Sequence, residues 1–241
     1  MKILLFFLSG LGSLTFGFSQ GVKKDSSTDM QLKNVTGLYN KYTAGNAPVY
    51  NGTDYLYFTF QMEGDPFFEI GDLSNGWLSY KGIVYDPLSV KYDLARNQVV
   101  ILPLHGASGI VLDNEFIDSF MAAKHIFIHL KEDHQQNLYN TGFYDVLYNG
   151  HVQLLAKRTK TMSDKLDFGT VTTVFSSKDH FYIHKNGVYY LISNQKDVFR
   201  LLNDKKHELR KVMRQQDLKF RRNNFESTLV NVIAIYNQLI H

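Results

Sequence analysis

The stretch FYDVLYNGHVQLLAK, residues 143–157, decides the fold because it carries two strand signals separated by a turn signal. Apolar and polar residues alternate on both sides of Asn149-Gly150, and this pair tolerates the positive φ that a tight hairpin turn needs. The segments 180–184 and 188–192 repeat the pattern around Asn186-Gly187. We therefore predict antiparallel β-hairpins at both places.

Strand signals of the same kind fill the middle of the chain. Further strands are predicted in segments 82–86, 89–94, 98–102 and 124–130. Eight or more short strands with frequent turns are typical of an antiparallel sheet. We expect a curved antiparallel sheet over residues 49–193, arranged as a sandwich or an open barrel.

The last fifty residues change to a helical period. Six apolar residues share an arc of about 120° when they are placed at 100° per residue: Val198, Leu201, Leu202, Leu209, Val212 and Met213. Asn203-Asp204 predicts a break where a second helix is capped, and the apolar arc of residues 225–240 is wider. The sequence thus predicts an α+β fold in which the helices of residues 194–241 pack on the sheet within the same domain.

Residues 1–19 have the pattern of a secretory signal peptide. Lys2 precedes an apolar centre, and the small residues Gly17 and Ser19 precede a cut after Ser19. The apolar centre has 16 residues, fewer than the roughly 20 of a membrane-spanning helix, so cleavage fits better than an anchor. We expect the mature chain to begin at Gln20 with a polar segment, residues 20–48, that includes a short helix near 29–42, and to contain no transmembrane helix.

Composition excludes several classes of site. The 241 residues include no Cys, which rules out a disulfide scaffold, a thiolate metal site and a cysteine nucleophile. The formal net charge of +3 is too small to indicate a nucleic-acid partner. We expect neither a cofactor nor a nucleic-acid ligand.

Positive charge is concentrated in the predicted helices. Residues 196–224 hold ten Lys or Arg against four acidic residues, a local charge of +6. Six cations spread over the helical side opposite the apolar arc: Lys196, Arg200, Lys206, Arg210, Lys211 and Arg214. Such a side suits anionic lipid headgroups, anionic glycans or an acidic protein partner. A solvated helix face with no partner is the alternative.

The histidines and tyrosines of the strands have structural explanations beside functional ones. His125 and His129, like His180 and His184, lie four residues apart in one strand, about 13 Å, which is too far for one metal ion. We expect Ile126, Ile128, Phe181 and Ile183 on the opposite, core face. Tyrosines such as Tyr189 and Tyr190 suit a half-exposed sheet face or a ligand groove. We predict no metal site.

The segment His105-Gly106-Ala107-Ser108-Gly109 resembles the shell of a serine hydrolase. The nucleophile elbow of such enzymes needs G-x-S-x-G between a strand and a helix, whereas here the spacing is Gly-Ala-Ser-Gly and a strand signal follows. We interpret the segment as a glycine-rich turn. If the protein is an enzyme, Ser108, His105 and Asp113 are the residues to test.

Several segments also resemble a functionally uncharacterised family of secreted cell-envelope proteins of Bacteroidota-type bacteria. The likeness rests on residues 18–20, 66–68, 82–88, 91–94, 142–150, 154–158 and 201–206. It implies an envelope location and an intact α+β domain, and it supplies no catalytic residues.

These patterns lead to one leading hypothesis and one alternative. The leading hypothesis is a non-enzymatic exported envelope protein, located in the periplasm, at the outer membrane or outside the cell. It would bind a protein partner or a lipid or glycan ligand through its sheet face and its basic C-terminal helices. The alternative is an envelope hydrolase that uses Ser108 and His105.

Overall fold

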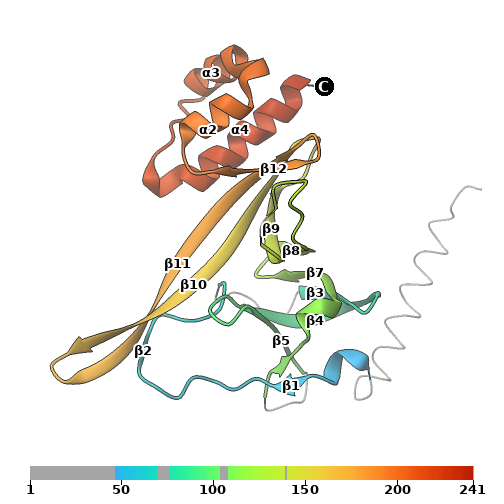
Figure 1. Cartoon of the computed structure of the whole chain (residues 1–241), viewed down its shortest axis with the longest axis vertical. Helices are drawn as coiled ribbons and strands as arrows, with labels where there is room; N and C mark the ends of the chain where they lie inside the picture. The colour runs from blue at the N-terminus through green and yellow to red at the C-terminus, as the bar shows by residue number, and fades with distance from the viewer. Residues whose placement is uncertain (1–46, 70–75, 104–107, 139, 241) are drawn as a thin grey trace, which may run out of the picture. The chain divides into compact units, whose positions relative to one another are not determined.

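The computed structural model describes residues 47–69, 76–103, 108–138 and 140–240 (Figure 1). The strands are β1 Thr53–Asp54, β2 Met62–Glu63, β3 Gly76–Tyr80, β4 Ile83–Asp93, β5 Gln98–Leu102, β6 Ile110–Val111, β7 Ile117–Ala122, β8 His125–Leu130, β9 Gly142–Tyr148, β10 Gln153–Asp167, β11 Thr170–Lys185 and β12 Val188–Ile192. The α-helices are α2 Gln195–Leu201, α3 Lys206–Gln215 and α4 Phe225–Ile240, and the 3-10 helices are η1 Pro48–Tyr50, η3 Asn114–Phe116, η4 Asn203–Lys205 and η5 Arg222–Asn224. The predicted signal peptide and the predicted helix near 29–42 lie outside the described residues.

The described strands form one sheet in the order β1-β6-β5-β4-β3-β7-β8-β9-β10-β11-β12. Neighbours along this path are antiparallel, whereas β2 pairs with β11 in parallel, with Met62 opposite Thr173. The path does not return to its first strand, so the sheet is open. This architecture confirms the predicted α+β fold, an antiparallel sheet followed by a helical segment.

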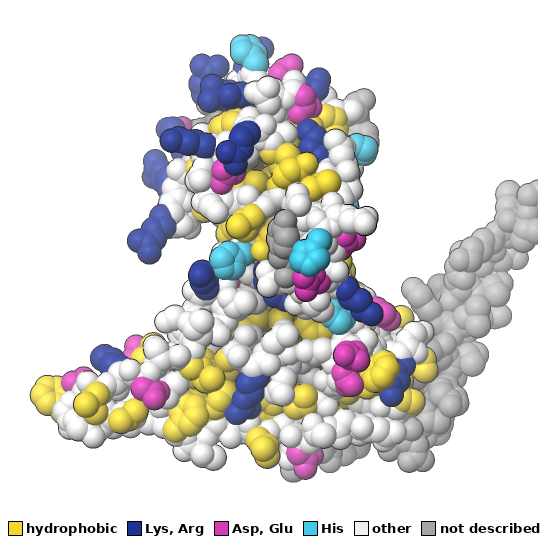
Figure 2. Space-filling view, in the orientation of Figure 1, with side chains coloured by type: hydrophobic (Ala, Val, Ile, Leu, Met, Phe, Trp, Pro, Cys, Tyr) yellow, Lys and Arg dark blue, Asp and Glu magenta, His cyan; other side chains and the backbone are white. Residues whose placement is uncertain are grey.

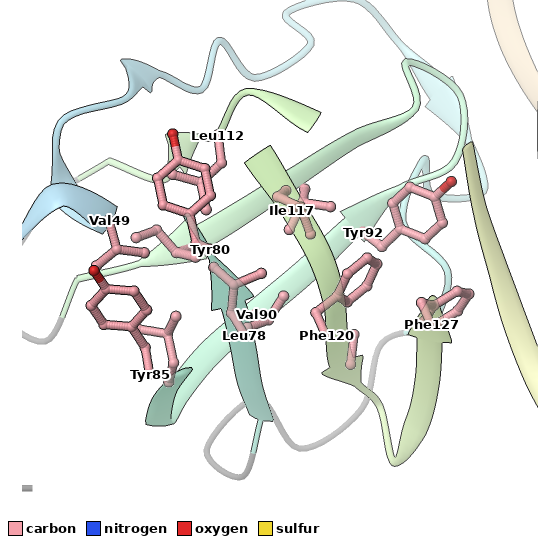
Figure 3. Close-up of a cluster of buried hydrophobic side chains, with 14 of the residues drawn as sticks. Val49, Leu78, Tyr80, Tyr85, Val90, Tyr92, Leu112, Ile117, Phe120 and Phe127 are labelled. Atoms are coloured by element: carbon pink, nitrogen blue, oxygen red, sulfur yellow. The ribbon is translucent and has the colours of Figure 1, made fainter. Parts of the chain in front are cut away.

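An aromatic cluster forms the core of the first half of the sheet (Figure 3). Tyr92, Phe120, Phe127 and Phe143 pack with ring centroids between 5.0 and 5.6 Å apart. Phe127 is fully buried, whereas Ile126 is 43% exposed. The prediction that the isoleucines of β8 face the core is therefore wrong for Ile126. The core face is the one that carries Phe127, because this ring completes the aromatic cluster.

A second hydrophobic cluster joins the sheet to the helices. Leu154 and Ile183 of the sheet are fully buried with Leu229 and Ile233 of α4 in this cluster. Most of the apolar arc predicted for the last helix is thus covered, which confirms that this helix packs on its neighbours. Among the described residues, no helix is both long and apolar enough to cross a membrane.

The predicted break between the first two C-terminal helices is present, but its chemistry differs from the prediction. Asn194 caps α2, because its side chain accepts hydrogen bonds from the backbone N–H groups of Lys196 and Asp197. Asp204 does not cap α3; its carboxylate accepts hydrogen bonds from Tyr236 at 2.8 Å and from Lys185 at 3.0 Å. The break is therefore held by contacts with α4 and β11.

The two predicted hairpins form with different turns. Asn186 and Gly187 have φ values of 54° and 75°, as a tight turn requires. At the first hairpin β9 ends at Tyr148 and β10 begins at Gln153, so the connection is wider. A Cβ at Gly150 would lie 2.8 Å from Oδ1 of Asn237. The absence of a side chain at Gly150 therefore allows α4 to pack closely against this connection.

The β10–β11 hairpin extends well beyond the strands that the sequence predicts. Its register runs from Gln153 opposite His184 to Asp167 opposite Thr170. The turn at its end places Phe168 in the left-handed region, with φ of 46° and a fully exposed side chain. Figure 1 labels the two strands of this hairpin, β10 and β11.

Candidate functional site: a cationic pocket on the C-terminal helices

The predicted basic side of the helices surrounds a pocket of about 600 Å³. Val198, Leu202 and Leu209 are fully buried and fix α2 and α3 against the second hydrophobic cluster. Residues on the other side of these helices therefore point outward. Figure 2 shows Lys and Arg side chains gathered over this helical part of the molecule.

Four cations from two helices line the pocket. Lys196 and Arg200 come from α2, and Lys206 and Arg210 come from α3. The remaining lining residues are Gln195, Phe199 and Asn203. The helix break at η4 is what brings the two pairs of cations to one place, although they are six or more positions apart in the chain.

The ring of Phe199 and one carboxylate order the pocket. The Arg210 guanidinium lies over the Phe199 ring, 4.9 Å from its centroid, a cation–π contact that limits the motion of the side chain. Arg200 donates to Asp197 at 2.8 Å, but its side chain is 80% exposed, so this ion pair leaves donors free for a ligand. Four cations against one carboxylate favour an anionic occupant.

The other two predicted cations lie outside this pocket. Arg214 lines a neighbouring recess together with Arg210 and His207, and its Nε donates to the backbone oxygen of Arg210 at 3.2 Å. Lys211 is exposed on α3 and lines neither recess. The structure thus brings together four of the six predicted residues and places Arg214 beside them.

Two of the three candidate hydrolase residues, Ser108 and Asp113, belong to the described part of the chain. Ser108 is exposed, and His105 lies outside the described residues. Asp113 accepts a hydrogen bond from the backbone N–H of Glu115 at 3.0 Å and so caps η3. The role of Asp113 in the structure is therefore that of a helix cap.

The strand histidines have separate partners. His129 is hydrogen-bonded through Nδ1 to the backbone oxygen of Ile117 at 3.0 Å, and His184 through Nδ1 to Gln153 at 3.2 Å. Within the described ranges, no three His, Asp or Glu side chains are placed to hold a metal ion.

The structure contains a buried charge cluster beside the sheet that the sequence did not predict. Arg158 on β10 donates to Asp145 on β9 at 2.8 Å and to Glu226 on α4 at 2.6 Å. It also donates to Asp179 on β11 at 2.9 Å. Asp145 is fully buried and Arg158 is 6% exposed. The only sequence signal is that Asp145 stands in an otherwise apolar strand segment; Arg158 lies between Lys157 and Thr159 and is not marked in this way.

His125 extends this cluster to β8. Its Nδ1 lies 2.9 Å from Oδ2 of Asp145, and its ring packs against Phe68, with centroids 5.0 Å apart. The hydrogen bond to Asp145 raises the pKa of His125, while burial and Arg158 oppose the rise and Glu69 adds to it. For Arg158 itself, burial lowers the pKa, but hydrogen bonds to Glu226 and Asp145 outweigh this effect and raise it. The cluster links four strands to α4 through charged partners.

The raised pKa of His125 predicts that this residue stabilises the fold in acid. A His whose folded pKa lies above its unfolded value contributes stability below the unfolded pKa, about 6.5, and loses it as pH rises through the folded value. The free energy of unfolding lost on His125→Gln should therefore be larger at pH 6 than at pH 8, by on the order of 1 kcal/mol for a half-buried charge-assisted bond.

Urea denaturation of the unmodified chain and of His125→Gln, each at pH 6 and pH 8, measures this difference. Burial lowers the pKa of His129 and of His184, so these two histidines destabilise the fold in acid, but they are present in both proteins and cancel in the comparison. An equal loss at pH 6 and pH 8 would contradict a charged His125.

Comparison with protein-family models, with curated proteins and with solved structures finds no match. A function for this chain is therefore proposed from its own sequence and geometry.

Proposed function

We propose that this protein is a non-enzymatic binding protein of the bacterial cell envelope that captures an anionic ligand in the cationic pocket between α2 and α3. The observation that carries the proposal is the convergence of Lys196, Arg200, Lys206 and Arg210 around one pocket of about 600 Å³. Export rests on the predicted signal peptide, residues 1–19. The acidic group of a lipid headgroup, a glycan or a protein partner has the chemistry that this pocket selects.

A phosphate-based probe tests the pocket without any other recognition element. We expect tripolyphosphate to bind the full mature chain in isothermal titration calorimetry at low salt and to bind more weakly as salt is raised. The double charge reversal Lys206→Glu/Arg210→Glu should weaken binding by about tenfold or more, a loss of about 1.4 kcal/mol. Both side chains lie at the surface of α3, so the fold should be retained.

A matched variant separates the pocket from net charge. Lys165→Glu/Lys178→Glu changes the net charge by the same amount on exposed positions of the β10–β11 hairpin. When both variants are titrated at 0.1 M salt, its affinity for tripolyphosphate should stay within about twofold of the unmodified chain, because screening then limits the reach of exposed charges to about 10 Å. Equal weakening by both variants, or no binding of tripolyphosphate at all, would contradict the proposal.

A further inference from the structure

A second pocket lies on the other flank of α2. Its volume is about 720 Å³, and Arg200 lines both this pocket and the cationic one. The second pocket is bounded by the end strand β12, by the turn that leads into β9 and by α2. Its lining residues are Asn137, Asn140, Tyr182, Tyr189, Tyr190, Leu191, Ile192, Asp197, Arg200 and Leu201. We call it the tyrosine pocket.

Two of its three tyrosines are held by other rings. Tyr189 stacks on His184 with centroids 4.3 Å apart, and Tyr182 meets Tyr144 edge to face at 5.6 Å. Tyr190 is 37% exposed. The pocket therefore offers one accessible aromatic ring beside a rigid aromatic wall, and such rings keep an apolar body and a polar tip.

The polar groups of the tyrosine pocket are planar. Asn140 is hydrogen-bonded to Tyr182, and the Asp197 carboxylate pairs with the Arg200 guanidinium at 2.8 Å. Amide, carboxylate and guanidinium groups each present two donors or acceptors in a plane. Vicinal hydroxyl groups of a pyranose ring match this spacing, while the C–H face of the same ring packs on an aromatic side chain.

The lining argues against a purely anionic or a purely apolar occupant. Its one cation, Arg200, also lines the cationic pocket, and a bare anion is better held there because Lys196, Lys206 and Arg210 surround it as well. A purely apolar ligand would shield the amide, carboxylate and guanidinium groups from water and add no hydrogen bond to them, which costs binding free energy. A sugar ring satisfies both the aromatic and the planar polar groups.

Resting on the proposed function, we propose that the ligand is an acidic glycan. One sugar ring occupies the tyrosine pocket, and an acidic substituent of the same chain lies among Lys196, Lys206 and Arg210. Arg200 stands between the two parts and contacts both. This proposal therefore excludes a lipid or a protein as the main ligand.

The test uses an array of oligosaccharides that carry uronate, sulfate or phosphate groups, each beside its neutral counterpart. We expect the full mature chain to bind at least one acidic oligosaccharide about tenfold more tightly than its neutral counterpart. Tyr190→Ala should weaken that binding about fivefold, the loss of one aromatic contact. The same variant should bind tripolyphosphate as tightly as the unmodified chain.

Tyr57→Ala is the matched control, because Tyr57 is also an exposed tyrosine, at 53%, and does not line either pocket. It should leave glycan binding unchanged. If tripolyphosphate binds but no oligosaccharide does, or if Tyr190→Ala has no effect, the glycan inference is wrong and the proposed function stands. If neither probe binds, the proposed function itself is wrong.

Discussion

Replacing Arg158 with Ala should lower the free energy of unfolding by about 3–5 kcal/mol, the usual cost of leaving one member of a buried ion pair without its partner. Arg158 binds Asp145 through two nitrogens, at 2.8 and 3.0 Å, and Glu226 through two more hydrogen bonds. Without it, His125 is the one cationic partner that the fully buried Asp145 keeps among the described residues. Guanidinium denaturation followed by circular dichroism measures the loss.

Two variants make this prediction specific. Asp179→Asn removes a partner of Arg158 whose side chain is 32% exposed, and it should cost less than about 1 kcal/mol, as surface ion pairs do. The double variant Arg158→Met/Asp145→Leu removes both buried charges and should recover part of the loss of Arg158→Ala. If Arg158→Ala costs no more than Asp179→Asn, the cluster is not a main source of stability.

Local patterns predicted many of the strands and the C-terminal helices, because both depend on neighbours in the chain, but they missed β3, β7 and the far end of the β10–β11 hairpin. Asn186-Gly187 adopts the positive φ values that its residue types favour. The choice of the core face of β8 is different, because both of its faces carry apolar residues. Only the rings of Tyr92, Phe120 and Phe143, which arrive from other strands, decide that Phe127 is inside.

The sequence predicted that the cations lie on one side of the helices, but it did not predict that they surround a pocket. Helical periodicity places Lys196 and Arg210 on the outer side of their helices. Their convergence needs the 3-10 turn at η4, which Asp204 holds through Tyr236 and Lys185. Asn203-Asp204 indicates the break, but these two partners lie in α4 and β11, so no local pattern of the sequence shows how the turn is held.

The Arg158 cluster could not be predicted from the sequence either, because its members are distant in the chain. Its members, His125, Asp145, Arg158, Asp179 and Glu226, come from four strands and a helix. A sequence shows that Asp145 is unusual between Tyr144 and Val146, and it does not show which distant cation neutralises it. The tyrosine pocket likewise combines a turn, an end strand and a helix.

Asn237→Leu is expected to destabilise the contact between α4 and the first hairpin by about 2–6 kcal/mol, because two buried backbone groups lose their partners at about 1–3 kcal/mol each. Asn237 is 3% exposed. Its Oδ1 accepts from the N–H of Val152 at 2.9 Å, and its Nδ2 donates to the carbonyl of Val152 at 3.0 Å. Urea denaturation gives the total loss, and amide hydrogen exchange should speed up at Val152.

The wide turn after β9 explains why this single side chain has so large an effect. A tight Asn149-Gly150 turn would pair Val152 within the hairpin, whereas here Val152 depends on Asn237 from 85 positions away. Asn231→Leu, on an exposed position of the same helix, makes the same change of residue and should stay within about 0.5 kcal/mol of the unmodified chain. A similar loss for both variants would show that leucine disturbs α4 itself. A loss confined to Asn237→Leu, with faster exchange at Val152, would show that a helix side chain replaces the hairpin's own hydrogen bonds.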